Sequence, residues 1–340
     1  MDNSHLARVA LAATTMAASA MLPSYAGDSS VVAPDNLLKH KVVATIPVGR
    51  GPLALVASPD SDFVYVANFV SNDISIIDTI TNRVEATTIH IGMNQRALAI
   101  TPDGKYLYVV NGGNVSVIQT SNRGLVTTLT NVSPSGGSPA ISPDGSLAYF
   151  PSVAGFNSGQ IAVVRTSDNK VLDPIPLASG ASAVVFTSDG QYAYASLPPP
   201  RALLGSLSII ETFGRTVVGS IPVRDPTFLT ISPDGHTLAV AHRIGPHYTV
   251  VDTSTNRVTA HIMARGAHRP AAFTPDGKYF CILKSSETYL EIVSLATDTI
   301  VGHTRVGAGP VDVAIIPNGK YAYVCNFSDN TVSVIDVSTF

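Results

Sequence analysis

Short apolar runs alternate with polar turns along this chain, and the first complete example lies between Lys41 and Arg83. The segments between the runs are rich in Gly, Pro, Asn and Asp, which preset or tolerate the backbone angles of tight turns. The pattern therefore predicts four short strands in a row. They cover Val42–Val48, Leu53–Ala57, Phe63–Ala67 and Asp73–Ile77.

This unit recurs along the chain, and its clearest marker is a turn of the form Ser/Thr-Pro-Asp-Gly. Successive copies are ~41–45 residues apart, which suits one four-stranded blade per repeat. The sequence therefore predicts an all-β fold, a seven-bladed β-propeller. The seven turns begin at Ser58, Thr101, Ser142, Thr187, Ser232, Thr274 and, in weakened form, Ile316.

The two ends of the repeat array complement each other. The last copy stops before its fourth strand, whereas a spare strand, Lys41–Val48, precedes the first copy. We expect this N-terminal strand to complete the C-terminal blade, because an open array would leave an unpaired strand edge. Low charge (13%) and high hydrophobic content (45%) fit strands buried between blades. The propeller is predicted to occupy residues 41–340.

The first 26 residues have the pattern of an export signal. Arg8 supplies a positive charge, Val9–Leu22 is a short Ala-rich apolar run, and Ser24-Tyr25-Ala26 provides small residues for cleavage. Residues 27–40 form a polar lead-in. No later segment approaches the ~20 apolar residues of a membrane span. The sequence predicts a periplasmic or secreted protein without a transmembrane segment.

Two cysteines lie in the second strands of blades six and seven, Cys281 in KYFCILK and Cys325 in KYAYVCN. An exported protein is exposed to disulfide-forming conditions. Aligned on their turns, the two positions differ by two residues, so both side chains point the same way around the ring. They cannot face each other, and we predict buried free thiols.

Five short motifs recur along the chain: Tyr65–Asn68, Tyr108–Asn111, Tyr323–Asn326, Val332–Asp336 and Val43–Gly49. They resemble those of the YVTN-repeat β-propeller family. The resemblance covers Lys41–Phe340 and implies a propeller fold. Members of that family include cell-surface and envelope proteins, a periplasmic DNA-binding propeller and the propeller parts of periplasmic redox enzymes, and related propellers include lactone hydrolases.

Motifs for covalent, metal or cofactor chemistry are missing from the sequence. It contains no nucleophile elbow, His-Glu-x-x-His, Walker loop or Cys-x-x-Cys-His. The Asp-Gly turns lack the alternating carboxylates of a calcium loop. We therefore predict neither a metal nor a cofactor. A net charge of −3 does not favour nucleic acid as a partner.

Residues that break the repeat pattern are candidates for function, because all seven blades solve the same structural problem. Second strands end in Asn in three blades, but in His242 and Lys284 in blades five and six. Blade six also begins with His268 and Arg269. We predict an off-centre ligand-binding mouth over these two blades. Its residues are His242, Arg243, His247, His268, Arg269 and Lys284, with Arg224 and Arg265 on neighbouring loops.

Ordinary solvated loop residues are the alternative interpretation of this cluster. A metal site from His242, His247 and His268 is disfavoured by Arg243 and Arg269, since a cation ~6 Å from one such charge loses on the order of 3 kcal/mol per charge product. The arginines instead favour a small anion.

Two longer segments, Pro151–Gly159 and Leu197–Gly205, are predicted to be loops on the same face. The second could form a lid over the channel or contact a protein partner.

Three function classes follow from these features. The first is a non-catalytic binding or scaffold propeller of the cell envelope that recognises a small anion or a protein partner. The second is a lactonase-like hydrolase or lyase, with His242 or His268 as general base and Arg269 stabilising an oxyanion. The third is a propeller subunit of a periplasmic oxidoreductase whose cofactor lies on another chain. The first is preferred, because no nucleophile, carboxylate pair or metal cluster is recognisable.

Overall fold

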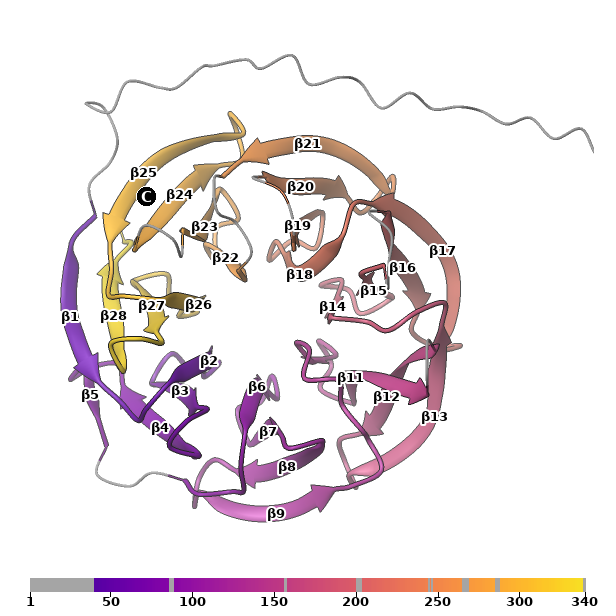
Figure 1. Cartoon of the computed structure of the whole chain (residues 1–340), viewed down its shortest axis with the longest axis horizontal. Helices are drawn as coiled ribbons and strands as arrows, with labels where there is room; N and C mark the ends of the chain where they lie inside the picture. The colour runs from indigo at the N-terminus through magenta and orange to yellow at the C-terminus, as the bar shows by residue number, and fades with distance from the viewer. Residues whose placement is uncertain are drawn as a thin grey trace, which may run out of the picture. The chain divides into compact units, whose positions relative to one another are not determined.

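The computed structural model describes residues 40–85, 89–155, 158–199, 204–243, 245, 247–264, 269–284 and 288–338. The predicted export signal, residues 1–26, lies outside them, as do Arg265 and His268. The described residues form 28 strands in seven four-stranded antiparallel sheets. Figure 1 shows the sheets arranged around a common axis, with the first strand of each innermost. The predicted seven-bladed all-β propeller is confirmed.

The strands of blades one to four follow the repeat. Blade one contains β2 (Pro52–Ala57), β3 (Phe63–Asn68), β4 (Asp73–Asp78) and β5 (Arg83–Val84). Blade two contains β6 (Gln95–Ile100), β7 (Tyr106–Asn111), β8 (Asn114–Gln119) and β9 (Gly124–Leu129). Blade three contains β10 (Ala140–Ile141), β11 (Leu147–Gly155), β12 (Ser158–Arg165) and β13 (Lys170–Leu177). Blade four contains β14 (Ala183–Phe186), β15 (Tyr192–Leu197), β16 (Gly205–Glu211) and β17 (Thr216–Val223).

Blades five to seven continue in the same order. Blade five contains β18 (Pro226–Ile231), β19 (Thr237–His242), β20 (His247–Asp252) and β21 (Arg257–Met263). Blade six contains β22 (Ala271–Phe273), β23 (Tyr279–Lys284), β24 (Tyr289–Ser294) and β25 (Thr299–Arg305). Blade seven contains β26 (Pro310–Ile315), β27 (Tyr321–Asn326), β28 (Thr331–Asp336) and the N-terminal β1 (Val42–Pro47).

The N-terminal strand β1 belongs to the same sheet as the last three strands of the chain. It pairs antiparallel with β28, with Ala44 opposite Val334 and Ile46 opposite Val332. Ile46 is buried in a cluster that also contains Val332 and Val334. Blade seven is thus assembled from both ends of the propeller segment (Figure 1).

The core is divided into apolar clusters between neighbouring blades. Cys281 packs with Val324 in the cluster between blades six and seven, whereas Cys325 packs with Val64 in the cluster between blades seven and one. Both side chains therefore point the same way around the ring. Both thiols are free and buried, which confirms the prediction.

Native Cys281 and Cys325 are expected to resist a soluble thiol reagent. Burial raises the pKa of Cys281 to about 12 and that of Cys325 well above its ordinary value, so the reactive thiolate is absent at neutral pH. Titration should detect almost no reactive thiol in the native protein and two after unfolding in guanidinium. Two fast-reacting thiols before unfolding would contradict this packing.

The Ser/Thr-Pro-Asp-Gly turns are closed by their own side chains. In blade two, Asp103 Oδ1 accepts from Thr101 Oγ1 at 2.6 Å and from the Lys105 amide at 3.1 Å. Thr101 Oγ1 in turn accepts from the Tyr106 amide at 3.0 Å. The positive φ of 71° at Gly104 suits glycine. These bonds show that the turn residues serve the fold.

Adjacent blades are also joined by tyrosine hydroxyls. A second-strand tyrosine donates to an asparagine in a turn of the next blade, and each of these asparagines has a positive φ. The pairs are Tyr108 with Asn169 (2.8 Å), Tyr194 with Asn256 (2.6 Å) and Tyr323 with Asn82 (2.8 Å). The tyrosine of the repeat motif therefore has a structural role.

The segment Pro151–Gly159, predicted to be a loop, is largely strand. β11 continues to Gly155 and β12 begins at Ser158, with Ser152 opposite Gln160. Gly159 permits close approach of backbone, since a Cβ there would lie 1.9 Å from the Ser179 carbonyl oxygen. Of the second long segment, residues 200–203 lie outside the described residues.

Over the part of the chain that is described, no helix has the length and apolar character that crossing a bilayer requires.

Candidate functional site

The last position of the second strand has a structural function in blades one, two and seven. Asn68, Asn111 and Asn326 are buried there. Each amide donates to a serine hydroxyl of the third strand, over distances of 2.8, 3.0 and 2.9 Å. In these three blades the side chain at this position satisfies buried hydrogen bonds.

His242 takes over this structural function in blade five. Its side chain is 1% exposed, Nε2 lies 2.8 Å from Thr249 Oγ1, and Nδ1 bonds to the Arg224 carbonyl oxygen. Burial is the main cause that lowers the pKa of His242. Its role as a ligand contact at the mouth is therefore corrected: the ring is enclosed, and protein groups occupy both nitrogens.

His247 is half-buried beside His242. Its ring centroid lies 4.7 Å from that of His242 and 5.3 Å from that of His261. Burial, followed by the two neighbouring histidines, lowers the pKa of His247 to about 4. The ring is thus neutral at pH 7 and brings no positive charge to an anion. Among the described residues, no group of three or more His, Cys, Asp or Glu is arranged to hold a metal ion.

Two other predicted cations have acidic partners. Arg243 Nε donates to Oδ2 of the buried Asp225 carboxylate at 3.1 Å, and Arg243 Nη2 lies 3.0 Å from Oδ1 in the same ion pair. Lys284 Nζ lies 3.8 Å from Glu291 Oε1. Arg224 is exposed, and its backbone oxygen bonds to His242. Arg265 and His268, as noted, lie outside the described residues.

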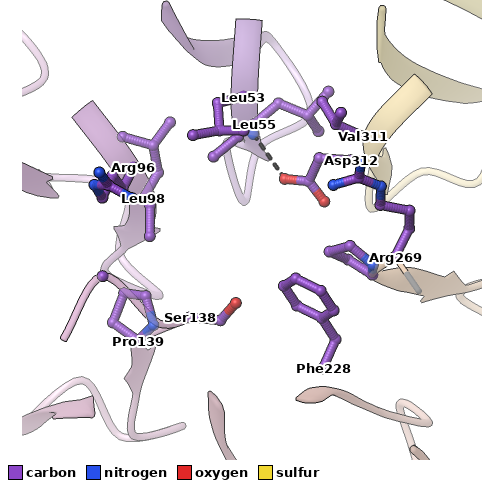
Figure 2. A pocket seen from close by; sticks show the side chains of 14 residues that line it. Leu53, Leu55, Arg96, Leu98, Ser138, Pro139, Phe228, Arg269, Val311 and Asp312 are labelled. Atoms are coloured by element: carbon purple, nitrogen blue, oxygen red, sulfur yellow. Dashed lines mark hydrogen bonds between the residues drawn. The ribbon is translucent and has the colours of Figure 1, made fainter. Parts of the chain in front are cut away.

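A cavity of about 170 Å³ occupies the channel at the ends where the innermost strands begin. Arg269, one of the predicted site residues, lines this cavity. Figure 2 shows Arg269 beside Asp312 on one wall and Arg96 on the opposite wall. Other lining residues are Leu53, Leu55, Leu98, Ser138, Phe228 and Val311.

Arg269 and Asp312 form the charged wall of this cavity. The Nε atom of Arg269 is buried and has no hydrogen-bond partner. Burial lowers the pKa of Arg269, and the nearby Asp312 carboxylate opposes that effect. Asp312 Oδ2 accepts from the Leu55 amide at 2.9 Å, and Oδ1 accepts from the Val313 amide at 2.9 Å. Burial raises the pKa of Asp312 to about 7 despite these bonds and Arg269.

Arg96 is the principal residue that the sequence interpretation missed. It occupies the same repeat position in blade two as Arg269 in blade six. Its guanidinium carbon lies 5.2 Å from the centroid of the Phe69 ring. A Cβ at Gly136 would lie 3.0 Å from Arg96 Cδ, so glycine leaves room for this side chain. The signal was present in the sequence, as a second arginine at an inward-facing position.

Comparison with known proteins gives two kinds of similarity. No family model matches the chain. A segment of 44 residues is 41% identical to hydrazine synthase subunit beta of Kuenenia stuttgartiensis, and it spans 13% of this chain and 11% of that protein.

Solved structures match over most of the propeller. Kuenenia stuttgartiensis hydrazine synthase has a TM-score of 0.76 at 23% identity, covering 85% of this chain and 96% of that chain. The β-propeller domain of Myceliophteria thermophila Cps50 (Swd1) has a TM-score of 0.74 at 14% identity, covering 88% and 100%. At these identities, the matches establish the propeller fold.

Proposed function

We propose that this chain is a non-catalytic binding propeller of the cell envelope that holds a small anionic ligand in its channel. The observation that carries the proposal is Arg269, which lines the cavity and whose buried Nε has no hydrogen-bond partner. A buried donor of this kind costs free energy until it is satisfied. An anion in the cavity would satisfy it.

The charges that line the cavity support an anion as ligand. Arg96 and Arg269 provide two positive charges, and Asp312 is the one acid among the described lining residues. Leu53, Phe228 and Val311 make part of the wall apolar, which strengthens electrostatic attraction to a bound charge. The proposed site thus lies in the channel, and among the described residues Arg269 is the one it shares with the mouth predicted over blades five and six.

Replacing Arg269 with Gln is expected to weaken binding of a small anion at least ~10-fold, because the variant loses a charge-assisted hydrogen bond. Calorimetric titrations with phosphate, sulfate and acetate would measure this change. Binding to the original protein should also weaken as ionic strength rises.

Arg224→Gln is the matched control for this substitution. Arg224 is exposed and, unlike Arg269, does not line the cavity, so the affinity should change little. If none of the three anions binds the original protein, or if the Arg224 variant loses binding and the Arg269 variant keeps it, the channel site is wrong.

A second candidate function is that of a propeller subunit in a periplasmic oxidoreductase whose cofactor lies on another chain. It is favoured by the 44-residue similarity to a protein named as a subunit of hydrazine synthase. The chain purified from its native envelope should then run as a complex with an identified, cofactor-bearing protein. Recovery as a single chain under mild extraction would count against this candidate.

Export from the cytoplasm and membership of the YVTN-repeat family are further parts of this proposal. Export rests on the signal-like pattern of residues 1–26, and membership of the YVTN-repeat family rests on the recurring motifs. The hydrolase or lyase alternative gains no support from His242, because both nitrogens of its buried ring are engaged.

A further inference from the structure

The acid in the channel is a fixed part of the proposed binding site. Asp312 receives backbone hydrogen bonds from two strands, at 2.9 Å from Leu55 of β2 and at 2.9 Å from Val313 of β26. These bonds hold its carboxylate on the wall beside Arg269 (Figure 2). A ligand that reaches Arg269 therefore meets a carboxylate acceptor next to the guanidinium donor.

We propose that the channel binds a small amphoteric acid, a molecule with a carboxylate and a hydrogen-bond donor on the adjacent carbon, such as a 2-amino or 2-hydroxy acid. This inference rests on the proposed function and narrows its ligand class. The ligand carboxylate binds Arg269, and the neighbouring ammonium or hydroxyl group donates to Asp312.

The arrangement of charges favours such a ligand over a simple anion. A bare carboxylate bound to Arg269 would hold its negative charge close to that of Asp312, and like charges repel strongly away from bulk water. An ammonium group beside the ligand carboxylate removes this repulsion. Each Asp312 oxygen accepts one backbone hydrogen bond and retains a further lone pair for the ligand.

The volume of the cavity suits a ligand of a few carbon atoms. Its volume is about 170 Å³, and a cavity of roughly 150 Å³ is known to accommodate benzene, which has about six heavy atoms. Phe228, Leu53 and Val311 supply apolar contacts for a short side group. A three-carbon acid fits these limits.

Three acids with one carbon skeleton test the inference directly: propionate, 2-hydroxypropionate and 2-aminopropionate. Calorimetric titration at pH 8 keeps Asp312 ionised, since its pKa is about 7. We expect 2-aminopropionate to bind at least ~10-fold more tightly than propionate, with 2-hydroxypropionate between them. Propylamine, which lacks the carboxylate, should bind more weakly than 2-aminopropionate.

Asp312→Asn is the companion variant. It removes the negative charge and should reduce the preference for 2-aminopropionate over propionate to less than ~3-fold, while Arg269→Gln weakens both acids. If Asp312→Asn does not fold, the ligand series on the original protein decides the question by itself.

The two proposals fail in different ways. Equal binding of propionate and 2-aminopropionate, with both lost in Arg269→Gln, would overturn this inference and leave the anion site standing. A preference for 2-aminopropionate that persists in Asp312→Asn would also overturn it. If no carboxylate or inorganic anion binds, the proposed function itself fails.

Discussion

Deleting residues 39–48 is expected to lower the free energy of unfolding by on the order of 5 kcal/mol or more. The deletion removes β1 and with it the fourth strand of blade seven. Burial of Ile46 alone is worth about 2–5 kcal/mol by comparison with large-to-small substitutions. The ladder to β28 adds hydrogen bonds of about 1 kcal/mol each. Because blades pack against their neighbours, we expect the loss of stability to extend from blade seven to blade one.

Urea unfolding and thermal melting of the deleted and complete proteins would measure this loss. Two point variants of β1 make a matched pair: Ile46 is 4% exposed and Val43 is 44% exposed. Ile46→Ala should cost about 2–5 kcal/mol, whereas Val43→Ala should stay within about 0.5–1 kcal/mol. A deleted protein that melts like the complete one would show that β1 does not hold the ring closed.

The architecture could be predicted from sequence because its signals are local and recur seven times. The turn at Thr101–Gly104 closes on its own side chains, so its residues indicate a turn in any context. The two-residue offset between Cys281 and Cys325 likewise fixes which face of its blade each thiol occupies, since side chains alternate along a strand. The hairpin after Pro151 was missed because Pro151 and Gly159, residue types that usually interrupt strands, lie within its paired strands.

The candidate site was predicted only in part, because a break in the repeat has more than one cause. His242 differs from the asparagines of other blades, yet it satisfies a comparable set of buried hydrogen bonds. Residue type alone does not show whether an unusual residue at a repeat position replaces a structural group or is free to bind a ligand. Arg269 and Arg96 share one inward-facing repeat position, but their separation in space depends on how the ring closes. The role of Asp312 could not be predicted from local sequence either. Its hydrogen-bond partner Leu55 is 257 residues away in the chain and is brought close only when the ring closes.

The second large effect is expected in acid: the free energy of unfolding should fall steeply below about pH 4. Aspartates of the recurring turns accept hydrogen bonds from a serine or threonine hydroxyl and from a backbone amide. The hydroxyl bond is the largest cause that lowers their pKa, and for Asp103 the value reaches about 2. The others are Asp60, Asp144, Asp189, Asp234 and Asp276.

The sign of this effect follows from proton uptake. Below an ordinary aspartate pKa of about 3.9, the unfolded chain binds protons that the native turns still exclude. The native state is therefore favoured above that pH, and its advantage is lost as pH falls toward the lowered values. Asp312 acts in the opposite sense at higher pH. Because its pKa is about 7, its contribution to stability falls as pH rises from about 4 to about 7.

Blade seven shows which substitution to use in the test. Asn318 stands in its turn where other blades have aspartate, and its side-chain oxygen accepts from the Lys320 amide at 2.9 Å. Urea unfolding from pH 7 to pH 2.5 would give the slope of stability against pH. Asp103→Asn, then Asp144→Asn, then Asp189→Asn should each reduce the slope below pH 4 and lower the stability at pH 7, because an amide oxygen keeps the turn bonds but lacks the charge that strengthens them. A slope that stays constant through all three substitutions would mean that other groups cause acid unfolding.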